Sequence, residues 1–339
     1  MMKGDILNKS VREAAEENEK IILSPYASLA CNSLGRDREE PECEIRTCYQ
    51  RDRDRIIHCK AFRRLKHKTQ VFLAPEGDYY RTRLTHTLEV SQIARTIARA
   101  LKLNEDLTEA CALGHDLGHT PFGHAGERAI NDLSGIRFNH NEQSVRVVDK
   151  IEKGGKGLNL TKEVKNGILC HTNGEEAFTL EGRIIRIADK IAYINHDIDD
   201  AVSAGVICEE DLPSEFTDVL GKSKSQRINR LVLDVVENSE NEIAQSDKIK
   251  KAFSGLCEFM FKNVYNSPVC RKEDEKAYCI IEKLYLYYIS NIDELPAGYL
   301  SIAENEGSER AVCDYIAGMS YTFALRKYNE LFIPEILLG

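Results

Sequence analysis

Residues 84–101 read LTHTLEVSQIARTIARAL, and their apolar side chains recur at spacings of four or five: Leu84, Leu88, Ile93, Ile97 and Leu101. Such spacing places these side chains on one face of an α-helix. Residues 183–202, RIIRIADKIAYINHDIDDAV, have the same helical period. Three further segments are expected to be helical: 248–265, 276–290 and 309–331. Because strand-like alternation and hairpin signals are rare, the sequence predicts an all-α fold.

Two interruptions divide this helical pattern. Residues 152–159, EKGGKGLN, are rich in glycine and predict a surface loop. Residues 203–225 contain an acidic run and Pro213, and we expect them to end the preceding helix. The sequence therefore predicts an N-terminal segment, a principal helical domain and a C-terminal helical region that packs on it: residues 1–20, 21–205 and 206–339.

The composition is that of a folded protein. Hydrophobic residues make up 42% and charged residues 30% of the 339 residues, which argues against disorder. A formal net charge of −9 means that bulk electrostatics will not attract nucleic acid, so any anion site must be local. No apolar stretch approaches the roughly 20 residues that span a bilayer, and no secretory signal is visible.

The eleven cysteines are scattered through the chain. Several, including Cys111 and Cys279, lie in apolar helical patterns, where a free thiol packs as a small hydrophobic group. An odd number of cysteines without framework spacing favours a reducing compartment. We therefore expect a soluble, cytoplasmic protein without disulfides.

Residues 114–127, GHDLGHTPFGHAGE, concentrate the polar chemistry of the chain. The adjacent His115 and Asp116 can supply a neutral nitrogen and a hard oxygen to one divalent metal ion. His124 and Glu127 are then available as proton-transfer groups, and a helix would place them on one face. This density of polar side chains predicts a metal-dependent hydrolase.

Two adjacent ligands do not complete a metal site. We expect the remaining ligands to be polar residues inside apolar helical patterns, and His86 and Asp189 are the candidates. Taken alone, a helical histidine is more often satisfied within the core, and a lone aspartate is more often solvated. In combination with His115 and Asp116, however, the pattern favours His86 and Asp189 as ligands of the same metal ion.

The order His86, His115-Asp116, Asp189 resembles the H…HD…D pattern of the HD-domain phosphohydrolases. The flanking sequence is similar to the bacterial dGTPase-like branch of the deoxynucleoside triphosphate triphosphohydrolases. The similar motifs cover nearly the whole chain: SPY at 24–26, RDRDR at 51–55, FRRLKHKTQV at 62–71, RTRLTHT at 81–87, FNHN at 138–141, ADKIAY at 188–193 and DYIAGM at 314–319.

The resemblance implies an all-α HD domain that hydrolyses a dNTP, with dGTP among the substrates, to a deoxynucleoside and tripolyphosphate. One divalent ion (Mn, Mg, Ni, Fe or Zn) would bind His86, His115, Asp116 and Asp189. His124 would protonate the leaving 5′-oxygen, Glu127 would orient His124, and His140 would be a further histidine of the active site.

The resemblance also assigns residues to the substrate. Tyr193 would pack where a 2′-hydroxyl would lie, and Asp197 would accept from the 3′-hydroxyl, which selects deoxyribose. Gln70 would contact the sugar and base, and Arg83 and Lys190 would lie near the phosphates. Family members form homo-oligomers, and some bind an activating nucleotide or single-stranded nucleic acid. The basic residues 60–68 match the region near the pocket and subunit contacts, although a solvated helix face is the alternative.

One departure is visible, because Asn139 stands where the family often has glutamate beside the histidine. Two alternatives stay open. The chain could be another HD phosphohydrolase that acts on nucleoside monophosphates, cyclic dinucleotides or guanosine alarmones. It could also be a catalytically silent nucleotide-sensing protein. The presence of His124, Glu127, Tyr193 and Asp197 favours the dNTP hydrolase, since simpler HD enzymes need only the four metal ligands.

Overall fold

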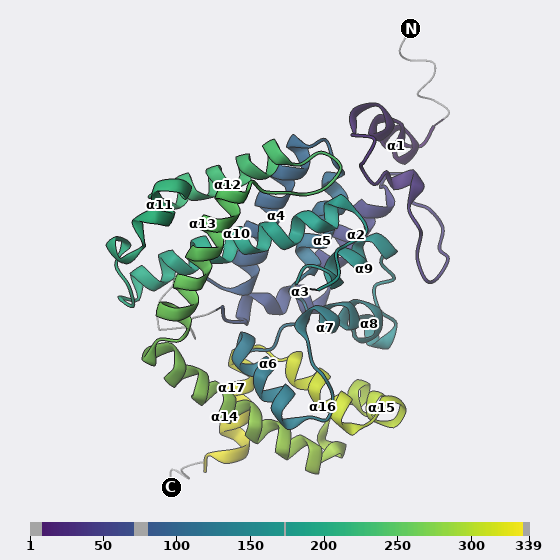
Figure 1. Ribbon diagram of the computed structural model, residues 1–339. Coiled ribbons are helices and arrows are strands. Elements are labelled where there is room, and N and C mark those ends of the chain that lie inside the picture. The colour runs from purple at the N-terminus through teal and green to yellow at the C-terminus, as the bar shows by residue number, and fades with distance from the viewer. Residues whose placement is uncertain (1–8, 71–80, 173, 335–339) are drawn as a thin grey trace.

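The computed structural model describes residues 9–70, 81–172 and 174–334 (Figure 1). Within these ranges the chain is helical, and its β-type pairing is limited to two isolated bridges, Arg36 with Thr161 and Thr69 with Thr82. The all-α prediction is confirmed. No helix in the same ranges combines the length and apolar character needed to cross a bilayer.

A first hydrophobic core lies in the upper part of Figure 1. The helices that contribute buried side chains to it are α2 Cys48–Ile57, α3 Lys60–Arg64, α4 Arg83–Ala100, α5 Glu105–Gly114, α9 Lys162–Leu169, α10 Leu180–Ser203, α11 Ser214–Leu220, α12 Lys224–Asn238 and α13 Asp247–Met260. The long helices α4 and α10 pack against each other and against α5. These three helices form the centre of the upper part.

A second hydrophobic core lies in the lower part. It is built from α6 Gly123–Leu133, α14 Pro268–Ser290, α15 Ala297–Glu306, α16 Ser308–Ala317 and α17 Tyr321–Phe332. Helix α6 comes from the middle of the sequence but packs on α14. The remaining helices, α1 Val11–Ile22, α7 His140–Arg146 and α8 Glu152–Gly155, lie around the upper core. The predicted division at residues 20 and 205 stays a prediction.

Local sequence explains where the central helices begin. Thr82 caps α4 by accepting a hydrogen bond from the Thr85 backbone, and Asn104 caps α5 in the same way from Leu107. The buried face of α4 differs from the predicted stripe, because Leu88 is 52% exposed. The apolar residues that α4 buries are Val90, Ile93, Ala94, Ile97 and Ala98. These positions recur every three or four residues, which is the true helical period.

Residues 248–265 are helical as predicted, with α13 followed by a π-helical turn, Phe261–Tyr265. Two further expectations need correction. Residues 309–331 are not one helix, because α16 ends at Ala317 and Ser320 caps a new helix, α17, through the Phe323 backbone. All eleven cysteines are free; Cys111 is buried as expected, but Cys279 is exposed.

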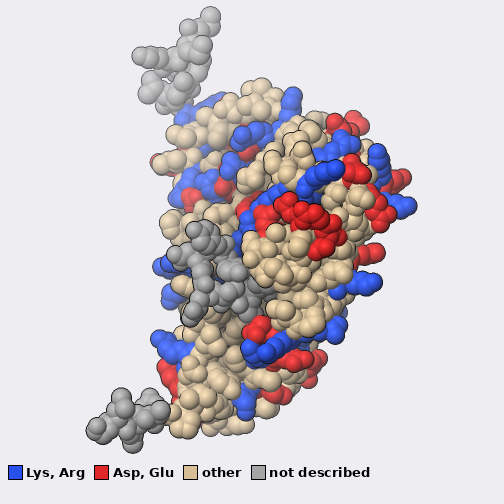
Figure 2. All heavy atoms as spheres, turned by 90° about the vertical axis from the view of Figure 1, so that its left-hand side faces the viewer, with Lys and Arg blue, Asp and Glu red and all other residues tan. Residues whose placement is uncertain are grey.

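The molecular surface carries both signs of charge. On the face shown in Figure 2, acidic and basic side chains of the described residues are interspersed. The basic stretch 60–68 agrees with a solvated face at Lys60, Arg63 and Lys66, which are exposed. Lys68 is the exception, because it is 1% exposed.

Candidate active site

The four predicted metal ligands converge from three helices of the upper core. His86 lies on α4, His115 and Asp116 directly follow α5, and Asp189 lies on α10. The His86 Nε2 atom lies 3.0 Å from Asp189 Oδ1. The His115 Nε2 atom lies 3.8 Å from the same oxygen and 3.9 Å from Asp116 Oδ1. The packing of α4, α5 and α10 therefore creates a cluster of two imidazoles and two carboxylates.

Unsatisfied atoms show that this cluster fits a metal ion. His115 Nδ1 lies 2.6 Å from the Ala112 carbonyl, to which it donates its proton. This hydrogen bond leaves a lone pair on Nε2, and that atom is buried without a hydrogen-bond partner. A second hydrogen bond of this kind is the usual means of orienting a metal-ligating histidine. Because a buried acceptor without a partner is unfavourable, the site suits a cation beside Asp116 and Asp189.

The charges of the two carboxylates support the same conclusion. Burial opposes ionisation of Asp116, but Arg83, whose Nη1 lies 2.6 Å from Asp116 Oδ2, outweighs it and holds the pKa of Asp116 well below its usual range. Burial likewise opposes ionisation of Asp189, and the hydrogen bond from His86 lowers its pKa overall. Both groups are therefore anionic at neutral pH, as ligands of a divalent cation must be.

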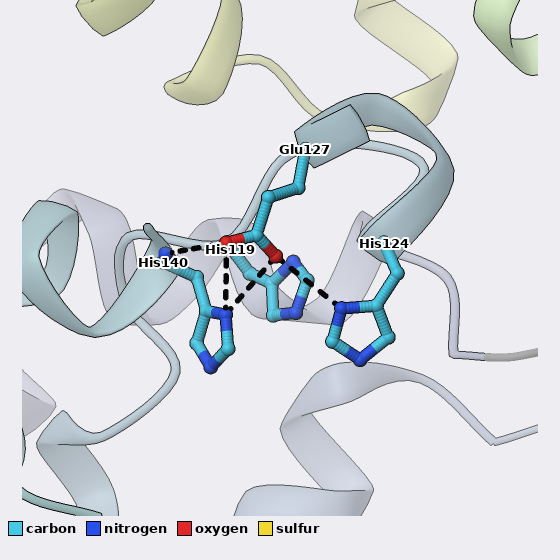
Figure 3. Close-up of side chains that lie close together, drawn as sticks. All are labelled: His119, His124, Glu127 and His140. Atoms are coloured by element: carbon cyan, nitrogen blue, oxygen red, sulfur yellow. Dashed lines mark hydrogen bonds and ion pairs between the residues drawn. The ribbon is translucent and has the colours of Figure 1, made fainter. Parts of the chain in front are cut away.

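A second cluster contains His119, His124, Glu127 and His140 (Figure 3). His124 Nδ1 lies 3.3 Å from Glu127 Oε2, so the predicted contact along α6 is present. His140 Nδ1 lies 3.1 Å from the same oxygen, and the His140 backbone donates to Glu127 Oε1 over 2.9 Å. Burial opposes ionisation of Glu127, but these hydrogen bonds hold its pKa well below its usual range.

The backbone at the start of α6 requires glycine. Gly123 has a φ of +57°, and a Cβ atom there would lie 2.9 Å from Arg83 Nη2 and 3.7 Å from the Gln70 carbonyl oxygen. Residues with a side chain rarely adopt this backbone conformation. Gly123 therefore allows α6 to begin directly against Arg83, which turns His124 and Glu127 toward His140.

Ring contacts join the two clusters into one array. The sequence has nine histidines, and seven of them follow one another in ring contact: His196, His86, His115, His171, His140, His119 and His124. His171 was missed by the sequence analysis, although it is a polar residue directly after the apolar helix α9. Burial, together with His115 and His140, lowers its pKa to about 3. His171 is therefore the neutral link between the clusters.

The face of α10 that was predicted to bind the sugar carries Asp197 and Tyr193. Asp197 is buried, its Oδ2 accepts a hydrogen bond of 2.7 Å from the Tyr265 hydroxyl, and its Oδ1 has no hydrogen-bond partner. Burial raises the pKa of Asp197 to about 7. Tyr193 is half-buried one turn earlier, against the upper core. The sequence analysis missed Tyr265, because nothing local connects it with residue 197.

The other predicted substrate residues are Arg83, Gln70 and Lys190. Arg83 is buried and pairs with Asp116. Gln70 ends a described range, and its Nε2 atom is buried without a partner. Lys190 follows Asp189 on α10 and is half-buried. The structure thus places Arg83 in the metal cluster, while the predicted contact of each of these residues with a substrate stays a prediction.

Two buried residues connect the active site with α16. The Lys68 ammonium donates to the His119 carbonyl and, over 2.9 Å, to the Ala317 carbonyl at the end of α16. Asp314 on α16 accepts from Gln143 Nε2 over 2.8 Å and from Arg146 Nε over 2.8 Å, both on α7. Helix α7 begins with His140. The motif at residues 314–319 therefore acts as an anchor for the second cluster.

Comparisons with known proteins agree with this site. Residues 83–194 match the HD domain family, and residues 243–330 match the phosphohydrolase-associated domain. A deoxyguanosinetriphosphate triphosphohydrolase-like protein of Caldanaerobacter subterraneus is 57% identical over 96% of this chain and 96% of its own. A protein of the same name from Clostridium perfringens is 51% identical over 97% of this chain and 99% of its own.

Sequence identity of this extent over nearly the full length of both chains establishes homology. The match to the HD domain includes all four predicted metal ligands. HD domains bind divalent metals, and the cluster of His86, His115 and Asp116 is arranged to hold one. The chain therefore belongs to the HD-domain deoxyguanosinetriphosphate triphosphohydrolase-like family, and it is a hydrolase.

Proposed function

We propose that this protein hydrolyses dNTPs, with dGTP among them, to a deoxynucleoside and intact tripolyphosphate. The observation that carries the proposal is the junction of two clusters through Asp116, His171 and His140, which form one group of possible ligand atoms. A metal site alone would serve many HD hydrolases, whereas an adjoining histidine–glutamate pair suits a reaction whose leaving group must be protonated. The names of the relatives support the same substrate class.

In this proposal, His86, His115, Asp116 and Asp189 hold one divalent ion, which can be Mn, Mg, Ni, Fe or Zn. When bound, such an ion supplies Lewis-acid polarisation of the α-phosphate and a lowered pKa for water. Arg83 favours the anionic form of Asp116, and the hydrogen bond from Nδ1 to the Ala112 carbonyl orients the ring of His115. Arg83 and Lys190 would counter the charge of the phosphates.

His124 is the proposed general acid. The bond between the α-phosphorus and the 5′-oxygen breaks, the oxygen of water becomes bonded to phosphorus, and the 5′-oxygen takes a proton from His124 Nε2. Glu127 accepts from His124 Nδ1 and stabilises the imidazolium before transfer. The proton lost by water passes to solvent, from which His124 is protonated again. His140 holds Glu127 in place from the other side.

The face of α10 would select the sugar. Asp197 Oδ1 is buried without a partner and would accept a hydrogen bond from the 3′-hydroxyl. Tyr193 would occupy the space that a 2′-hydroxyl requires, and Gln70 would contact the sugar and base. A cytoplasmic location remains a proposal taken from the cysteine pattern. A homo-oligomer, an activating nucleotide and single-stranded nucleic-acid binding remain proposals taken from the family resemblance.

Product analysis tests the proposal. Metal-loaded protein is incubated with each dNTP and each NTP, with and without a second dNTP as activator. We expect deoxynucleoside and tripolyphosphate, intact ribonucleotides, and no turnover by the Asp116→Ala variant. His58→Gln, a change at an exposed histidine outside the array, is the matched control. Monophosphate or diphosphate products would identify another HD hydrolase, and nucleotide binding without turnover would identify a sensor.

A further inference from the structure

The cluster of His119, His124, Glu127 and His140 has the donor set of a transition-metal site. Three imidazoles and one carboxylate offer ligand atoms that all lie within 4.8 Å of one another. This set differs from the two imidazoles and two carboxylates of the first cluster. Nitrogen-rich sites favour late first-row ions such as Zn²⁺, whereas Mg²⁺ prefers oxygen ligands.

The measured separations agree with tetrahedral coordination. In a tetrahedral zinc site with bonds of about 2.0–2.1 Å, two ligand atoms lie about 3.3 Å apart. Glu127 Oε2 is 3.3 Å from His124 Nδ1 and 3.1 Å from His140 Nδ1. Each of these two separations therefore matches the spacing of two ligand atoms on one ion.

His119 supplies an independent indication of a ligand. Its side chain is 1% exposed, and its Nδ1 atom is buried without a hydrogen-bond partner. Its ring stacks on His140 at 4.5 Å and meets His124 at 5.0 Å between centroids. Figure 3 shows the four side chains turned toward one another, with His119 between the other two histidines. The buried nitrogen thus lies among the three possible ligands.

We propose that His119, His124, Glu127 and His140 form a second metal site, selective for Zn²⁺ or a similar late transition-metal ion, and that its occupation inhibits the enzyme. Ligation would engage His124 and Glu127 and so remove the proposed proton donor. This inhibitory consequence rests on the proposed function, whereas the binding itself does not. His124 is 67% exposed at its side chain, which gives an ion access from solvent.

Metal counting tests the binding. Protein is saturated with Zn²⁺, freed of unbound metal and analysed for zinc per chain, with Co²⁺ absorption as a probe of four-coordinate geometry. We expect two ions in the wild type and one in either His119→Gln or His124→Gln. Asp189→Asn should also lose one, but from the first site, and His58→Gln should keep two. Because His124 is exposed, its variant tests the site even if the change at buried His119 prevents folding.

Inhibition is tested separately in Mn²⁺-supported turnover. Added Zn²⁺ should reduce the wild-type rate while manganese stays bound, and excess Mn²⁺ should not restore the rate. For His119→Gln, which lacks one of the four proposed ligands, inhibition relative to its own zinc-free rate should need more than about 10–100-fold more zinc, because that range is already typical of losing a residue that only supports a ligand.

Wild-type protein that binds one zinc ion, or histidine variants that still bind two, would overturn the site. Zinc that raises the rate, or that inhibits only by displacing manganese, would overturn the inhibitory role. If no dNTP is hydrolysed, the proposed function fails, and the metal counts still decide whether the second site exists.

Discussion

The two clusters of the active site are held in different ways. His86, His115 and Asp116 are buried, and their helices α4 and α5 belong to one hydrophobic core. The second cluster has His124 on its exposed side, and its helix α6 packs into the other core with α14 and α16. One cluster is therefore positioned by a single packed unit, and the other by the junction of two.

This difference predicts a role for the C-terminal helices in catalysis. Lys68 and Asp314 are buried links across the junction, because Lys68 donates to the end of α16 and Asp314 lies on α16. If the helices of the lower core shift, His119 and His140 move with them, whereas the metal ligands stay within the upper core. The comparison thus predicts that metal binding and proton transfer can be lost separately.

Loss of a metal ligand should have the largest effect. Asp189→Asn removes an anionic ligand, so we expect turnover to be abolished and metal content to fall. Asp199→Asn changes a partly exposed carboxylate on the same helix whose ion pairs with Arg81 and Lys224 lie near the surface, and it should keep both. Normal metal content in Asp189→Asn would contradict the assignment of the first cluster.

Loss of the Glu127 carboxylate, which contacts two histidines, should have the second-largest effect. Glu127→Gln removes the anion that His124 and His140 both contact, and we expect kcat to fall by about 10²–10⁴. The metal content of the first cluster should not change, which separates the two regions. Glu142→Gln, at an exposed position of α7, is the control. A rate near that of the wild type would show that proton transfer does not use this pair.

Loss of the Asp314 side chain, which joins α16 to α7, should lower the turnover rate less than the changes above. It should clearly lower the free energy of unfolding. Asp314→Asn neutralises the buried carboxylate that pairs with half-buried Arg146 and leaves Glu306 as the remaining charged partner of that arginine, so we expect the unfolding free energy to fall by at most the roughly 3–5 kcal/mol that breaking a fully buried pair costs. We expect kcat to fall with KM and metal content little changed, because α7 carries His140. Glu306→Gln alters an exposed partner of the same arginine and should cost less than about 1 kcal/mol.

The last expected effect is a pH dependence of stability from Asp197. Its pKa is about 7 in the folded protein and about 3.9 when unfolded, so the folded state binds the proton more tightly. The free energy of unfolding should therefore decrease as pH rises from about 4 to about 7. Urea titrations across this range should show a flatter profile for Asp197→Asn. An identical profile would mean that Asp197 is not desolvated.

Local pattern predicts those parts of the candidate site that lie on single helices. Asp189 is a polar position inside a helical period of isoleucines, and His124 and Glu127 are neighbours on one helical turn. Hydrophobic periodicity predicted two features incorrectly: it placed Leu88 on the buried face of its helix, and it made 309–331 a single helix. The pattern of apolar residues does not show which of them other helices will bury. Lys68, read as part of a basic face, is buried because two carbonyls from distant segments receive its ammonium.

By itself, the sequence determined the helical architecture and the His124–Glu127 pair, because spacing along a helix places such residues on one face. The four candidate metal ligands lie on, or directly after, three different helices, and the sequence named them through the H…HD…D order. Only the tertiary structure brought in His171, Tyr265 and Asp314. These three act through contacts between segments far apart in the chain, and nothing in their local sequence records the partner. The joining of two histidine clusters into one array is likewise a property of packing, since no single helix contains it.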